Sequence, residues 1–152
     1  MLRKLLAVVV GYVLLAGVLM VAFTGTAIML GLDGVYKPGL YEPATSWIML
    51  SFVYGMLAAI AGGYVCRWIG RSRQLLHAFA GVVLLLGIVS AVVAYTSAKD
   101  PGPRLPGETL TEAVRKTNQP LWVALLNPLV GAVGVLVGGT LRRDPPQPDR
   151  SA

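Results

Sequence analysis

The fold is decided by stretches such as residues 120–141, which read PLWVALLNPLVGAVGVLVGGTL and carry no charged side chain. Three further uncharged runs precede it, at residues 5–32, 47–66 and 75–98, and all 13 Lys and Arg and all 7 Asp and Glu lie outside these runs. A helix needs about 20 apolar residues to cross the ~30 Å hydrocarbon core of a bilayer. The sequence therefore predicts an all-α integral membrane protein, a four-helix bundle of membrane spans.

The composition agrees with a membrane protein of one domain. Charged residues make up 13% of the chain and the mean hydropathy is +0.68, whereas soluble domains contain about 25% charged residues. The spans leave only short loops, so we expect a single domain over residues 1–143. The Pro-rich polar residues 144–152 are expected to form a disordered cytoplasmic tail.

The first apolar run could instead be a secretory signal peptide, because Arg3 and Lys4 precede it and residues 24–27 offer small residues for cleavage. The apolar region of a signal peptide is typically about 7–15 residues long, and this run is longer. We therefore predict a first span that tilts strongly or extends beyond the hydrocarbon.

The charges predict an orientation in the membrane. One side of the four spans has a net charge of +6, and the other side has a net charge of zero. Short cytoplasmic loops retain an excess of Lys and Arg, so both termini and the 67–73 loop are predicted to be cytoplasmic in a bacterial inner (plasma) membrane. Anionic lipid headgroups are the expected partner of these cations. Nucleic acid is not expected, because no domain presents the cations together.

The glycine spacing suggests an internal duplication. Gly55 precedes Gly62 and Arg67 by the same intervals at which Gly131 precedes Gly138 and Arg143. Arg3 and Gly11 likewise match Arg73 and Gly81 in spacing. Such a duplication would produce two helical hairpins as parallel repeats, related by an axis along the membrane normal. The alternative is chance, because 18 glycines generate many coincident spacings.

Two spans carry a stripe of small or polar residues on one helical face. Within lipid, such residues let helix backbones approach closely, either inside one chain, which we favour, or against a second protein. Val135 lies off this face and is expected to point away from the contact. The predicted packing residues are Ser51, Gly55, Ala59 and Gly62 in the second span and Asn127, Gly131, Gly134 and Gly138 in the fourth.

Asn127 and Pro128 form the most polar point within any span. Proline lacks the amide hydrogen of a helix and clashes with the carbonyl four residues earlier, so Pro128 predicts a kink near residue 124. An unsatisfied amide is costly in lipid. We therefore expect Asn127 to point inward and to bond to a neighbour or to the carbonyls that the kink frees.

The loop before the fourth span is predicted to contain a short amphipathic helix on the outer membrane surface. Thr109 and Glu112 have the spacing of a capping box, and Glu112 and Lys116 form a favourable i,i+4 pair. Pro120 then opens the fourth span.

No catalytic, metal-binding or cofactor-binding pattern is visible, so enzyme activity and cofactors are not expected. Cys66 is the only cysteine and His77 the only histidine, which excludes an intrachain disulfide and a bis-histidine haem. Residues 35–39 (VYKPG), the Gly-Gly pairs and residues 119–128 (QPLWVALLNP) resemble uncharacterised small four-span bacterial membrane proteins. That resemblance implies a bacterial source and no particular activity.

Three functions stay open. The favoured hypothesis is an accessory or scaffolding subunit that packs through its small-residue faces against a larger membrane protein complex or a second copy. A homo-oligomeric small channel or transporter is the second, although proton-driven transporters need a membrane carboxylate that the spans lack. The third is a lipid- or quinone-binding membrane protein.

Overall fold

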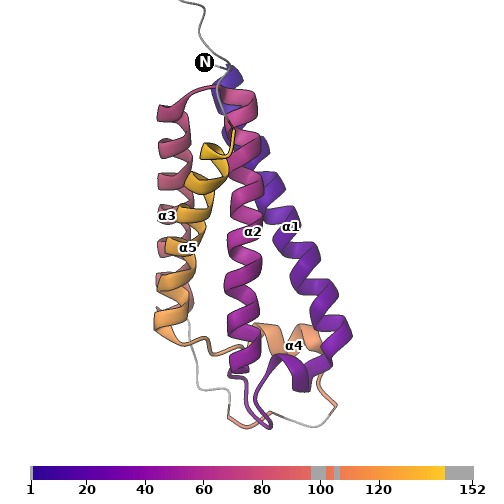
Figure 1. The fold of residues 1–152 in the computed structure, drawn as a ribbon. Helices are drawn as coiled ribbons and strands as arrows, with labels where there is room; N and C mark the ends of the chain where they lie inside the picture. The colour runs from indigo at the N-terminus through magenta and orange to yellow at the C-terminus, as the bar shows by residue number, and fades with distance from the viewer. Residues whose placement is uncertain (1, 97–101, 105–106, 143–152) are drawn as a thin grey trace, which may run out of the picture.

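The computed structural model describes residues 2–96, 102–104 and 107–142. The helices are α1 Leu2–Val35, α2 Thr45–Gly70, α3 Arg73–Thr96, α4 Leu110–Arg115 and α5 Leu121–Thr140 (Figure 1). Of these, α1, α2, α3 and α5 are long and apolar enough to cross a membrane. An all-α chain with four such helices is thereby confirmed. The tail predicted at residues 144–152 lies outside the described residues.

The four long helices lie in the order α1, α2, α5, α3, so that α2 and α5 occupy the middle. They converge at the end that holds the N-terminus and the α2–α3 turn, here called the basic end (Figure 1). At the opposite end, here called the loop end, α1 diverges from α2 and α4 lies between them. The α1 helix is interrupted at Gly31, whose φ of 66° and ψ of −176° are not helical. At 1.5 Å per residue, the regular helix before Gly31 alone spans about 44 Å, which exceeds the ~30 Å hydrocarbon thickness.

The basic end corrects one expectation about the loops. Arg67 was assigned to the loop after the second span, but α2 continues to Gly70 and Arg67 is only 4% exposed. The helix ends at Arg71, whose φ of 49° is left-handed and whose amide donates to the Arg67 carbonyl over 3.0 Å. Arg67 is therefore buried in the last turns of α2, and only Arg71 and Ser72 connect α2 to α3.

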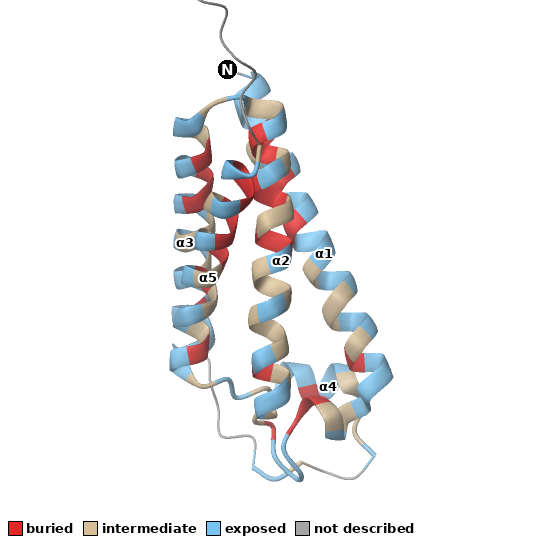
Figure 2. Ribbon diagram, viewed as in Figure 1, coloured by how far each residue is buried: buried red, intermediate tan, exposed pale blue. Residues whose placement is uncertain are grey.

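The main hydrophobic core lies in the half of the molecule nearer the basic end. Figure 2 shows the buried residues gathered there, while the outward faces of all four long helices are exposed. Phe79, Val135 and Cys66 are fully buried there, while Val123, in the first turn of α5, is fully buried toward the loop end. Outward-facing apolar residues are expected of spans that face lipid tails instead of water.

Glycines bring α2 and α5 into direct backbone contact. A Cβ at Gly63 would lie 2.1 Å from the Val135 carbonyl oxygen, and a Cβ at Gly138 would lie 2.0 Å from the Ile60 carbonyl oxygen. A Cβ at Gly134 would lie 2.7 Å from the Ala59 Cβ. At Gly63 and Gly138 the obstructing atoms belong to backbone, so these two positions admit no side chain and require glycine for the observed approach of the helices. A side chain at Gly134 would meet the Ala59 methyl group and would require a small shift of the two helices.

The predicted small-residue faces meet different neighbours. Gly134 and Gly138 face α2, but Gly62 faces α1, where a Cβ would lie 2.8 Å from the Gly11 carbonyl oxygen. The predicted duplication aligns Gly62 with Gly138, but Gly62 faces α1 whereas Gly138 faces α2. The duplication stays a prediction. The expectation for Val135 is wrong: its side chain is fully buried, because the backbone of α5 is held against Gly63 there.

The glycine contacts generate a stability prediction. Gly63→Ala and Gly138→Ala should each destabilise the protein by about 1–3 kcal/mol through overpacking, because the added methyl group meets backbone. Gly81→Ala is the matched control, since nothing lies within 4 Å of its Cβ position, and it should be neutral or slightly stabilising. Thermal unfolding in mild detergent measures the three variants. Equal melting temperatures would mean that α2 and α5 are not in backbone contact.

Candidate functional site

A cavity of about 410 Å³ lies between all four long helices. Each helix lines the cavity with residues from one face. On α1 these residues are Leu15, Leu19 and Phe23, which are spaced four residues apart and so lie on the same side of the helix. Most of the lining is apolar, and its polar members are neutral. This space is here called the central cavity, and its polar residues are Ser51, Ser90, Gln119 and Asn127.

The central cavity exists because small residues face one another beyond the close α2–α5 contact. Gly55 and Gly131 both line it, and no atom lies within 4 Å of a Cβ at Gly55. Gly55 was expected to form a packing contact, but it provides open volume. Pro128 closes one side, because its ring packs where Gly87 of α3 has no side chain: a Cβ there would be 2.5 Å from the Pro128 Cγ.

Asn127 faces the central cavity, and its side chain makes no hydrogen bond with another described residue. The expected bond to a neighbour is therefore not formed within the described part of the chain. Ser51, by contrast, donates to the Ile48 carbonyl over 2.7 Å. An amide side chain offers two N–H donors and one acceptor, so Asn127 can bond to a molecule inside the cavity.

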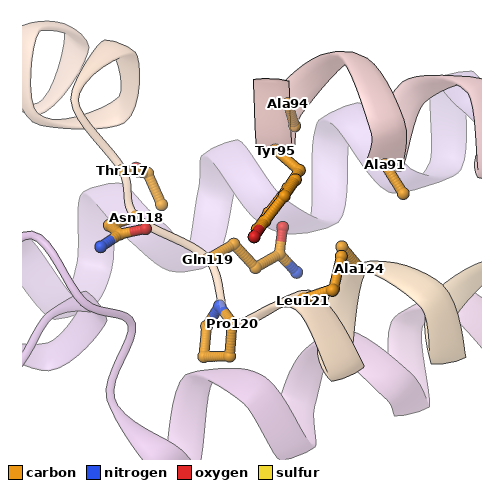
Figure 3. Close-up of a pocket in the computed structure, with 9 residues that line it drawn as sticks. All are labelled: Ala91, Ala94, Tyr95, Thr117, Asn118, Gln119, Pro120, Leu121 and Ala124. Atoms are coloured by element: carbon orange, nitrogen blue, oxygen red, sulfur yellow. The ribbon is translucent and has the colours of Figure 1, made fainter. Parts of the chain in front are cut away.

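A second space of about 380 Å³ adjoins the central cavity at the loop end (Figure 3). Both spaces are lined by Ala91, Ala94, Gln119 and Ala124. In Figure 3 the amide of Gln119 lies beside the side chain of Tyr95. We call this space the vestibule; it joins the central cavity to the polar loop end.

Sequence reasoning missed Ser90, Tyr95 and Gln119 as members of one site. Ser90 is a serine within an otherwise apolar stretch of α3, and Gln119 directly precedes the first residue of the fourth span, so both carried a weak polar signal. Nothing local indicated that α3 and the start of α5 would place them around one space.

The linings of the central cavity and the vestibule contain no Asp, Glu, Lys, Arg or His. Within the described residues no group of three or more His, Cys, Asp and Glu could hold a metal ion. His77 lies away from both spaces, and its Nδ1 is 2.8 Å from the Arg73 carbonyl oxygen. Comparisons with protein families, curated proteins and solved structures find no match. The chemistry of the site therefore rests on its own residues.

The loop end is held together by a polar cluster around Tyr41, here called the latch. Glu108 accepts hydrogen bonds from the Tyr41 hydroxyl and from the Lys116 ammonium group. The Lys116 Nζ lies 5.3 Å from the centre of the Tyr41 ring, and the Asn118 amide donates to the Tyr41 carbonyl over 3.0 Å. The latch ties the α1–α2 hairpin to the segment that leads into the vestibule.

The structure alters two details predicted for α4. The capping box is present, with Thr109 and Glu112 bonded to each other, but Lys116 pairs with Glu108 instead of Glu112. Ala113 is fully buried, in a cluster with Tyr36 and Tyr41. The helix is thus anchored to the protein, and only part of its apolar face, including Val114, is exposed.

The latch should loosen in acid. Hydrogen bonds from Lys116 and then Tyr41 lower the pKa of Glu108 below its usual 4.5, so the folded state favours the carboxylate. Its contribution to stability is complete above pH 4.5 and is lost as the pH falls through the lowered pKa. The protection factor of the Asn118 backbone amide, which compares its exchange with that of an unfolded peptide at the same pH, should therefore fall below pH 4.5.

Two variants check this assignment. Glu108→Gln should remove the acid dependence and leave Asn118 less protected at pH 7. Glu42→Gln breaks the exposed ion pair with Lys37 and should leave Asn118 unchanged. If the protection factor of the Asn118 backbone amide is the same in wild type and in Glu108→Gln at every pH, the latch does not hold the loop end.

Proposed function

We propose that this protein is a non-enzymatic, multi-pass membrane protein that binds a neutral lipid or quinone in the central cavity. The observation that carries the proposal is an uncharged cavity between the spans, lined by the side-chain amides of Asn127 and Gln119, neither of which bonds to another residue in the described part of the chain. Its volume of about 410 Å³ falls within the range of roughly 300–1,000 Å³ typical of small-molecule sites. An apolar body would fill it, and a small polar head would bond to Asn127 or to Gln119 in the vestibule.

The packing of the spans favours this function over the others. Ala59, Gly62, Gly134 and Gly138 are used in contacts inside the chain, which leaves these small residues unavailable for a scaffolding interface. A pore through one copy is disfavoured, because Phe79, Cys66 and Val135 are fully buried toward the basic end.

An accessory role beside a larger membrane protein is the second candidate. It is favoured by α1, whose half nearer the loop end is poorly covered: Met20, Val21 and Met29 are 74%, 74% and 87% exposed. Lipid tails or a partner helix could equally cover that surface. Purification from native membranes in mild detergent separates the candidates, since a stoichiometric larger complex supports the accessory role and bound lipid supports the cavity.

We also propose an orientation of the protein in the membrane. The described cations Arg3, Lys4, Arg71 and Arg73 lie at the basic end, where the Arg3 Nε donates to the Ile69 carbonyl over 2.8 Å. The positive-inside rule assigns this end to the cytoplasm, beside anionic headgroups. The loop end then faces outward, in a bacterial inner membrane by the resemblance noted above.

Cysteine labelling tests the orientation. In a Cys66→Ala background, Leu40→Cys at the loop end should react with an impermeant thiol reagent applied to intact spheroplasts. Gln74→Cys, an exposed position at the basic end, should react only after the membrane is opened. Labelling of Gln74→Cys alone in intact spheroplasts would reverse the proposed orientation.

Ligand binding is tested by filling the central cavity. Gly55→Leu should fold, because the added side chain enters open space, and it should weaken binding of decylubiquinone or dioleoylglycerol by at least about tenfold, a loss of about 1.4 kcal/mol. Gly81→Leu is the matched control, as its Cβ position also has no neighbour within 4 Å but it does not line the cavity. Binding is measured as the rise in melting temperature with added ligand. No rise for wild type with either ligand, or equal rises for both variants, would contradict the proposal.

A further inference from the structure

A separate cavity of about 550 Å³ opens between α1, α2 and α4 at the loop end. It lies where α1 diverges from α2 (Figure 1). Its walls are largely apolar, with Ala27 and Val35 from α1, Trp47 from α2 and Leu110 and Val114 from α4. We call it the wedge cavity. It shares only Phe23 with the lining of the central cavity.

Arg115 is the one charged residue in the lining of the wedge cavity. It is exposed and forms no ion pair with any described residue. The described acidic groups of the loop end are otherwise engaged. Asp33 pairs with Arg104, Glu42 with Lys37 and Glu108 with Lys116, and Glu112 accepts from the backbone and hydroxyl of Thr109. Arg115 therefore lacks an anion that the described part of the chain could supply.

The aromatic residues place the wedge cavity at the edge of the membrane. Phe23 packs against Trp47 and Tyr54, with ring centroids 5.6 and 5.7 Å apart. Tryptophan is enriched where hydrocarbon meets the headgroup region. With Trp47 at that level, α4 and Arg115 lie at the height of lipid phosphates, and the apolar walls of the cavity continue toward the acyl chains.

We propose that the wedge cavity binds one acyl chain of an anionic phospholipid, with the lipid phosphate at Arg115. An arginine guanidinium presents paired N–H donors that match phosphate oxygens, and an unpaired cation favours a lipid of net negative charge over a zwitterionic one. The apolar walls accept the chain. This site does not depend on the central cavity and would hold lipid even if the central cavity held none.

Fluorescence quenching reads this site directly. A protein with both Trp68→Phe and Trp122→Phe keeps one tryptophan, Trp47. This residue lines the wedge cavity. The protein is reconstituted in vesicles of unlabelled phosphatidylcholine that contain equal fractions of either bromoacyl phosphatidylglycerol or bromoacyl phosphatidylcholine. Quenching of Trp47 by the phosphatidylglycerol should be at least about twofold stronger. Arg115→Gln should abolish that preference, while Arg71→Gln, an exposed arginine at the basic end, should retain it.

Each result of the quenching experiment either supports or overturns lipid binding in the wedge cavity. Equal quenching by the two lipids, or a preference that survives Arg115→Gln in a variant with unchanged helix content, overturns the proposal. A bromoacyl fatty acid that quenches in an Arg115-dependent manner when the phospholipid does not would make a free carboxylate the occupant and also overturn it. Gly55→Leu fills the central cavity and should leave the quenching of Trp47 unchanged. The two sites can therefore be tested independently.

Discussion

The structure depends on the close approach of α2 and α5. In lipid there is no hydrophobic force that drives one apolar helix against another, so association relies on van der Waals contact between closely packed backbones. Gly63, Gly134 and Gly138 permit that contact, with α5 carbonyls and α2 carbonyls where side chains would otherwise lie. The outer helices then pack on this central pair, α1 on α2 and α3 on α5.

Tight packing at the basic end leaves open volume toward the loop end. The same class of residue has opposite effects in the two halves: at Gly138 the absence of a side chain admits a neighbouring backbone, whereas at Gly55 it leaves space. The latch of Tyr41, Glu108 and Lys116 holds the loops across the open half. The bundle is closed at one end and tied by polar contacts at the other. Between its helices it retains two partly open spaces, the central and the wedge cavities.

The spans could be predicted from sequence because the bilayer excludes charge regardless of tertiary packing, and the capping box of α4 could be predicted because it is local. The roles of single glycines could not. Periodicity places Gly55 and Gly134 on faces but does not say whether a neighbour fills the space opposite, which depends on how far the helices diverge. The pairing of Lys116 with Glu108, the burial of Arg67 and the burial of Val135 likewise follow from contacts between distant segments.

Disulfide cross-linking tests the central contact most directly. A Cβ at Gly134 lies close to the Ala59 Cβ, within reach of a disulfide after a small adjustment. In a Cys66→Ala background, Ala59→Cys combined with Gly134→Cys should oxidise in native membranes to an intrachain disulfide, seen as a monomer of altered gel mobility. Leu57→Cys with Leu129→Cys, at positions 58% and 51% exposed, should not cross-link within one chain. Dimers in place of the intrachain product, or no product at all, would contradict a bundle built on the α2–α5 contact.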